Sequence, residues 1–401
     1  MPLVLTNFGI GPLVSFDSEV RKTRVPHNDT NFGIGTLAGS VPTKWYSSAS
    51  SPLLAYAKLQ PRLSWKYVEL SMTDTALQIP RLYRALVSAA MILLAALIPG
   101  VAQSQTKIVA GMVAHGPPQW PQYIAMEFGW FKQDNIELEL LGVGGGGAQQ
   151  LAGGSLDIAH SGYPDFARAS LRGAPLKIII NDIIASPYAV FAKPQIKQIA
   201  DLKGKMISIG GITDVTLIYI KAFLASAGLK TTDVDFVYAK AAGDRFSALV
   251  SGSVDATLLN PPSYFKAAAS GFTNLGETAP HVKDIPFTVW AANSTWAAKN
   301  RAALAAFARS YKRGVEWLYN PANKELAIDI LVKHAKQDPK DSALAYDYLI
   351  AKLKLFGLDG NVSDATYEKM AEGLVELGDM KKPFPPKSAI FDGSFVQQAT
   401  N

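Results

Sequence analysis

From Lys107 onwards, short apolar runs alternate with amphipathic stretches of helical period, which is typical of an α/β fold. The apolar runs predict strands over 107–113, 135–141, 155–161, 176–182 and 188–192, and again over 203–210, 234–238, 253–259 and 287–292. The amphipathic stretches predict helices over 118–129, 148–151, 164–173, 213–229, 244–252 and 261–271. From Thr295 to the end we expect nearly continuous helix, with breaks at 320–325 and 336–342.

An internal repeat divides this pattern in two. Residues 149–173 and 247–271 align without gaps at an offset of 98, with seven of 25 positions identical. The strands upstream, KIVAGM and KMISIG, lie at the same offset. We therefore expect two similar α/β lobes, 103–192 plus 288–401 and 193–287, with the C-terminal helices packed on the first. Ligands of open α/β sheets bind at the carboxyl ends of strands, so we expect a cleft between the lobes there.

The first hundred residues follow a different pattern. Residues 72–102 have a charged start, an apolar run from about Ala85 to Ile98, and small residues at Gly100 and Ala102, which is typical of a secretory signal peptide. We expect cleavage; a retained membrane anchor is the alternative, although the run is short for a membrane span. Residues 1–71 hold no regular period, so we expect translation to begin at Met72, with a disordered extension as the alternative.

Composition limits the chemistry. The 401 residues carry a net charge of +6, of which residues after Ala102 contribute only +2, so no electrostatic footprint for nucleic acid exists. There is no cysteine, which excludes disulfides, thiolate nucleophiles and cysteine-based metal sites. No metal-spaced cluster, catalytic triad motif or phosphate loop is present, so we expect no cofactor, no metal and no catalytic residue.

Two glycine-rich segments are candidates for close backbone contact with a ligand. GVGGGG at 142–147 matches a dinucleotide motif, but the predicted helix after it is barely one turn long, which favours a flexible turn or another ligand. GGITDVT at 210–216 precedes a long helix and suits a carboxylate, sulfonate or phosphate. Thr213 is an equally good ordinary N-cap, and the charge of an unpaired Asp214 favours a ligand with a donor or cationic group.

The remaining candidates lie in loops that follow predicted strands. His115 and Trp120 follow the first strand, and Tyr163, Tyr264 and Trp290 lie near equivalent places, where packing is the alternative role. The candidate ligand-binding residues are His115, Gln119, Trp120, Ser161, Gly162, Tyr163, Gly211, Thr213, Asp214, Thr216, Asn260, Pro261, Tyr264 and Trp290.

The ordered set GWFKQDNIELEL, LAGGSLDIAHSG, ADLKGKMISIGG and SGSVDATLLNPP resembles a known family, the periplasmic solute-binding proteins of ABC importers for nitrate, sulfonates, taurine and thiamine-precursor pyrimidines. The resemblance covers roughly 107–336. It implies a type II periplasmic binding fold, two Rossmann-like lobes with a ligand cleft between them. It also implies ligand contacts at 115–119, 161–163, 211–216 and 260–261.

From this resemblance we expect a periplasmic, monomeric, non-enzymatic protein. It would capture a small organic solute, such as a sulfonate, carboxylate or pyrimidine-like molecule, and deliver it to an ABC permease and its ATPase in the inner membrane. Alternatives are an enzyme similar to thiamine pyrimidine synthase, a TRAP or sensory binding component, and an effector domain of a transcription regulator. The absence of cysteine argues against the first, since those synthases need a cysteine-rich motif.

Overall fold

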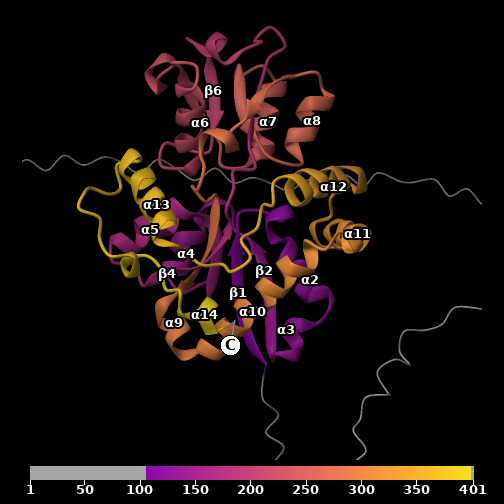
Figure 1. Ribbon diagram of the computed structural model, residues 1–401, viewed down its shortest axis with the longest axis vertical. Helices are drawn as coiled ribbons and strands as arrows, with labels where there is room; N and C mark the ends of the chain where they lie inside the picture. The colour runs from indigo at the N-terminus through magenta and orange to yellow at the C-terminus, as the bar shows by residue number, and fades with distance from the viewer. Residues whose placement is uncertain (1–104, 399–401) are drawn as a thin grey trace, which may run out of the picture. The chain divides into compact units, whose positions relative to one another are not determined.

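The computed structural model describes residues 105–398, which form two α/β lobes joined by two crossover segments (Figure 1). The predicted start at Met72, the signal peptide and the extension before it lie outside these residues. None of the helices within the described range is long and apolar enough to cross a membrane.

Each lobe contains one five-stranded sheet. In the first lobe the order is β2-β1-β3-β10-β4, with β10 antiparallel to its neighbours. In the second lobe the order is β7-β6-β8-β5-β9, with β5 antiparallel. The first sheet comprises β1 (Thr106–Met112), β2 (Ile136–Gly142), β3 (Ile158–Gly162), β4 (Leu176–Ile183) and β10 (Thr288–Asn293). The second comprises β5 (Ala189–Ala192), β6 (Met206–Ile209), β7 (Asp235–Tyr238), β8 (Ala256–Leu259) and β9 (Thr273–Glu277).

The two sheets share one topology, which extends the predicted repeat from sequence to structure. Matched carboxylates also make matched contacts: Asp157 Oδ2 accepts from the Val109 amide at 2.8 Å, and Asp255 Oδ2 accepts from the Met206 amide at 3.1 Å. Both bonds tie the residue just before a strand, β3 or β8, to the neighbouring strand. The acidic residue shared by the two repeats therefore fixes the start of a strand in each sheet.

In each sheet, the antiparallel strand is the one that the chain enters from a crossover between the lobes. β5 directly follows the first crossover, residues 184–188, and pairs within the second sheet, whereas β10 follows residues 278–287 and returns to the first. The expected boundary between 192 and 193 is therefore misplaced, because β5 pairs with β8 and β9 rather than with the first lobe. Strand β9 was not predicted. Its sequence TNLGE is polar and contains a glycine, so it lacks the apolar pattern of a strand.

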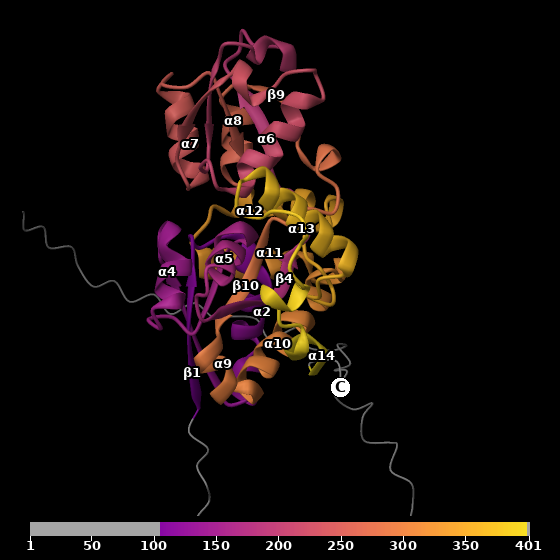
Figure 2. The same cartoon turned by 90° about the vertical axis from the view of Figure 1, so that its left-hand side faces the viewer.

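Helices cover the sheets of both lobes (Figures 1 and 2). Before the crossover back to the first lobe they are α2 (Trp120–Glu127), α3 (Trp130–Gln133), α4 (Gly147–Ala152), α5 (Tyr163–Leu171), α6 (Val215–Ala225), α7 (Ala242–Val250) and α8 (Ser263–Ala269). After it they are α9 (Ser294–Lys299), α10 (Arg301–Leu318), α11 (Lys324–Ala335), α12 (Pro339–Ala345), α13 (Asp364–Glu376) and α14 (Ser394–Gln398). A π-helix, Tyr346–Lys352, directly follows α12.

The C-terminal helices pack mostly on the first lobe, as expected from the sequence. Helix α10 crosses α2 so closely that Gly314 has no room for a side chain: a Cβ there would lie 2.5 Å from the Pro121 carbonyl oxygen. Helix α13 also contacts α6 of the second lobe, and Lys221 pairs with Glu376 across that contact at 3.2 Å. The C-terminal segment therefore touches both lobes.

Candidate ligand-binding cleft

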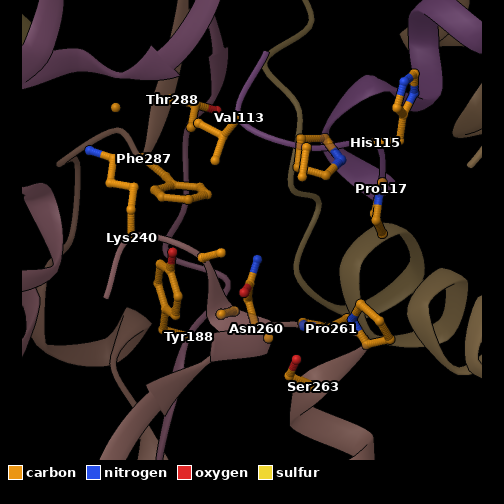
Figure 3. Close-up of a pocket in the computed structure, with 18 of the residues that line it drawn as sticks. Val113, His115, Pro117, Tyr188, Lys240, Asn260, Pro261, Ser263, Phe287 and Thr288 are labelled. Atoms are coloured by element: carbon orange, nitrogen blue, oxygen red, sulfur yellow. The ribbon is translucent and has the colours of Figure 1, made fainter. Parts of the chain in front are cut away.

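A cavity of about 360 Å³ lies where residues of the two lobes meet at the carboxyl ends of their strands (Figure 3). The first lobe contributes the loop after β1, from Val113 to Gln119, and the end of β3. The second lobe contributes the start of α6, residues 240–243 and residues 260–263. The cavity thus occupies the position expected for a ligand in this class of fold.

Half of the candidate ligand-binding residues line this cavity. They are His115, Gln119, Ser161, Gly162, Asp214, Asn260 and Pro261. They come from four segments that are far apart in the sequence: three follow strands β1, β6 and β8, and the fourth is the end of β3. Their contact with a ligand stays a prediction.

Three aromatic candidates lie in the core instead. Trp120 is fully buried and its Nε1 donates to the Ala327 carbonyl at 2.8 Å. Trp290 is fully buried against Phe307, and Tyr163 is fully buried beside Gly373. A fourth, Tyr264, stacks on Tyr348 of the π-helix with ring centroids 5.1 Å apart. These side chains pack the lobes and do not face the cavity.

The start of α6 is occupied by the protein itself. Asp214, not Thr213, is the N-cap, and its Oδ1 accepts from the amide and the hydroxyl of Thr216 at 2.9 and 2.7 Å. Thr213 is exposed, and its carbonyl accepts from Arg168 at 2.7 Å. Gly211, Thr213 and Thr216 do not line the cavity. The alternative that Thr213 caps this helix was wrong, because the helix begins at Val215 and the residue directly before it, Asp214, accepts from the free amide.

Asp214 is also not the unpaired carboxylate expected from the sequence. Lys240 Nζ lies 2.5 Å from Asp214 Oδ2 and 3.0 Å from Asp165 Oδ2 in the first lobe. Burial raises the pKa of the Asp214 carboxyl, but the charge of Lys240 and hydrogen bonds from Lys240 and Thr216 outweigh it, so the pKa lies below its usual value. Burial lowers the pKa of Lys240, but Asp214 and Asp165 together raise it. The three groups form an ionised bridge between the lobes.

A second buried pair lies on the first-lobe side. His160 Nε2 is 2.7 Å from Asp182 Oδ2, and His160 Nδ1 is 3.1 Å from the amide nitrogen of Gln119. His160 and Asp182 are 3% and 0% exposed. Asp182 also accepts from the Thr288 hydroxyl at 3.4 Å. Both ring nitrogens of His160 are therefore held by the protein, which leaves neither free for proton transfer to a ligand.

Uncharged polar groups and apolar side chains complete the wall (Figure 3). The side chains of Asn260 and Ser263 line the cavity, and no other described residue forms a hydrogen bond with them. Apolar surface comes from Val113, Pro117, Pro118, Val215, Pro261 and Phe287. This combination suits a small solute with an apolar body and a few polar atoms.

Several lining residues were missed from the sequence. Lys240 lies two positions after a predicted strand, so the rule that selected the other loops could have found it. Tyr188 and Phe287 lie in the crossovers and had no distinguishing pattern. Gln337 precedes α12, far from either repeat, and only the packing of the C-terminal segment brings it to the cleft.

The sequence pattern of the NMT1/THI5-like family matches residues 117–324, just over half of the chain. The chain belongs to the NMT1/THI5-like family. The matched region includes both crossovers and most of the residues that line the cleft. No protein with curated annotation matches the sequence.

Solved structures show the fold that this family member adopts. The periplasmic nitrate-binding protein NrtA from Synechocystis PCC 6803 matches with a TM-score of 0.63 at 14% identity, covering 74% of this chain and 88% of that chain. The periplasmic sulfonate-binding protein SsuA of a sulfonate ABC transporter from Methylobacillus flagellatus KT matches with a TM-score of 0.56 at 15% identity, over 74% and 94%. The desulfurization enzyme DszB matches with a TM-score of 0.54 at 13% identity, over 73% and 99%. The chain has the type II periplasmic binding protein fold.

Proposed function

We propose that this protein is the extracytoplasmic solute-binding component of an ABC importer. It captures a small organic solute, with sulfonates, carboxylates and pyrimidine-like molecules as candidates, between its two lobes and delivers it to a permease and its ATPase. The observation that carries the proposal is the cleft: both lobes line one cavity, and uncharged hydrogen-bonding groups and apolar surface face it.

Family membership and fold support this role. NrtA and SsuA, both similar in fold, are binding proteins by name, and SsuA belongs to an ABC transporter. The signal-peptide pattern at residues 72–102 fits an exported protein and supports a periplasmic location for the proposed function. Closure of two lobes around a solute is a common form of hinge motion and gives the permease a distinct liganded shape to recognise.

The same fold also serves enzymes, as DszB illustrates. Two features of this chain favour binding over catalysis. It has no cysteine, so no thiolate nucleophile is available. Of the two histidines on the cavity wall, His160 has both ring nitrogens hydrogen-bonded, to Gln119 and Asp182, and His115 Nδ1 lies 3.0 Å from the Tyr123 hydroxyl.

The test is a thermal-shift screen of residues 103–401 against nitrate, sulfonates, aromatic acids, amines and pyrimidines. A ligand at 100 times its dissociation constant adds about 2.7 kcal/mol of stability, which moves the midpoint of a chain this size by roughly 5 °C or more. Each ligand found is then tested by calorimetry on two matched variants.

Ala242→Trp fills the cavity wall, whereas Ser247→Trp changes an exposed position on the same helix, α7. We expect Ala242→Trp to abolish binding and Ser247→Trp to retain it. Binding that survives Ala242→Trp would place the ligand elsewhere and contradict the proposal.

A further inference from the structure

Several helices begin at the wall of the cleft, and most of their N-termini are closed to a ligand. Helix α6 is capped by the carboxylate of Asp214. Helix α8 is preceded by Pro261 and Pro262, and α5 has Pro164 in its first turn, so these ends lack N–H groups that a ligand would need. Helix α7 differs from all three.

Helix α7 spans nine residues and presents an uncapped N-terminus to the cavity. Its N-cap residue, Ala241, has no side-chain acceptor. Ala242 and Gly243 line the cavity, and no described residue accepts a hydrogen bond from their amides. Free amides at a helix N-terminus carry a partial positive charge, which favours an anion.

The side chain of Tyr188 gives a second, independent indication. It is 5% exposed and lines the cavity, and its hydroxyl points into the open space beside Asn260 (Figure 3). This hydroxyl accepts a side-chain hydrogen bond from Arg245, and no carbonyl or carboxylate of the described residues accepts a hydrogen bond from it. A nearly buried hydroxyl of this kind is placed to donate to a ligand.

A buried cation lies behind this part of the wall. Arg245, in the first turn of α7, is fully buried and donates to the carbonyls of Ala239, Lys240 and Leu258. Its Cζ lies 5.5 Å from the ring centroid of Tyr188. No carboxylate among the described residues pairs with it, and its Nη2 has no partner. An unpaired buried charge is costly, and a ligand of opposite charge nearby would offset that cost.

The charge of Lys240, by contrast, is already matched. Its Nζ contacts both Asp214 and Asp165, so two carboxylates already neutralise the ammonium. The positive character that remains for a ligand on the second-lobe wall comes from α7, from Arg245 behind it, and from Lys266, an exposed lining residue of α8. The part near Ala242 and Gly243 is fixed by the backbone of α7 and the buried Arg245 side chain.

We propose that the free amides of Ala242 and Gly243, with the hydroxyl of Tyr188, form a subsite for an oxyanion end of the solute, a carboxylate or a sulfonate. The apolar body of the solute then lies against Val113 and Phe287. This inference rests on the proposed solute-binding function and specifies which end of the solute the second lobe holds.

The experiment fills the subsite with a carboxylate of the protein's own. Ala241 has an extended backbone, φ −81° and ψ 135°, which suits an N-cap aspartate. Ala241→Asp therefore caps α7 and occupies its amides without disturbing the helix. Ser247→Asp adds the same charge at an exposed position of α7 and serves as the control.

The probes are benzenesulfonate and benzoate, with benzamide as the neutral match. Binding is followed through the ¹⁵N–¹H resonances of Ala242 and Gly243 and by calorimetry. We expect both acids to shift these two resonances, and Ala241→Asp to weaken acid binding at least tenfold while Ser247→Asp changes it less than twofold.

Three outcomes would overturn the subsite: no anion shifts the two resonances, benzamide shifts them as strongly as the acids, or Ala241→Asp binds the acids as tightly as the parent chain. Failure of the subsite is distinct from failure of the proposed function. Neutral solutes that bind in the cleft would leave solute capture intact.

Discussion

The bridge of Lys240, Asp214 and Asp165 makes a quantitative prediction about stability. Lys240→Met removes the ammonium but leaves the Asp214 carboxylate 90% buried. Breaking a buried ion pair costs about 3–5 kcal/mol. The Lys240 side chain is 30% exposed, so water can partly replace it, and we expect a loss of about 2 kcal/mol.

The double variant Asp214→Asn/Lys240→Met provides the decisive comparison. Asparagine is an equally good N-cap for α6 and carries no charge, so no buried charge is left unpaired. We expect the double variant to recover at least half of the stability lost by Lys240→Met alone. In urea unfolding, with a slope of about 3 kcal/mol per molar, the single variant should shift the midpoint down by roughly 0.7 M.

The pH dependence follows from the same groups. In the parent chain the pKa of Asp214 is lowered, so the stabilisation by the bridge is complete above the unfolded-state pKa of about 3.9 and is lost as the pH falls through the lower folded-state value. Without Lys240, burial is the main influence and raises that pKa. As the pH falls, the folded variant then takes up a proton before the unfolded chain does. The difference in unfolding free energy between the parent chain and the variant should therefore shrink. The ionised bridge would be refuted if this difference in unfolding free energy stayed constant with pH. It would also be refuted if the double variant were as unstable as Lys240→Met alone.

Two further predictions concern packing. Gly314→Ala should destabilise the protein by about 1–3 kcal/mol, because the added Cβ meets the Pro121 carbonyl oxygen. The control, Gly243→Ala, adds a Cβ that meets nothing within 4 Å and should be neutral or slightly stabilising. Thermal unfolding of both variants checks this, and equal effects would contradict the close crossing of α2 and α10. Tyr264→Ala removes the stack on Tyr348 and should lower stability by about 1 kcal/mol in urea titrations, while Tyr264→Phe keeps the ring and should stay within about 0.5 kcal/mol.

Much of the fold was predictable because two features of the sequence indicate the same architecture: the alternation of apolar and amphipathic segments, and the internal repeat. The offset between the segments starting at Gln149 and Ser247 indicated two lobes, and both sheets have one strand order. Strand β9 was missed because an edge strand needs few apolar residues. The β5 boundary was misplaced because its run AVFA does not reveal with which sheet it pairs.

The site was predictable only to the level of loops. The ends of strands identified His115, Ser161 and Asn260 as lining residues, since their position depends on topology alone. Side-chain pairing across the lobes depends on tertiary distance, which sequence order does not give. The contact of Lys240 with Asp165, 75 positions away, therefore could not be predicted, and Asp214 was taken to be unpaired.

The placement of β5 and β10 has a consequence for how the protein reaches its native state. In the first sheet, β10 lies between β3 and β4 and pairs with both, although it comes more than 100 positions after either. Until Thr288–Asn293 has emerged from a ribosome or a translocation channel, β3 and β4 each have an unpaired edge. Unpaired edges promote aggregation, and distant pairing slows folding. The first lobe begins first along the chain. Its sheet can nevertheless be completed only after the strands of the second lobe have emerged.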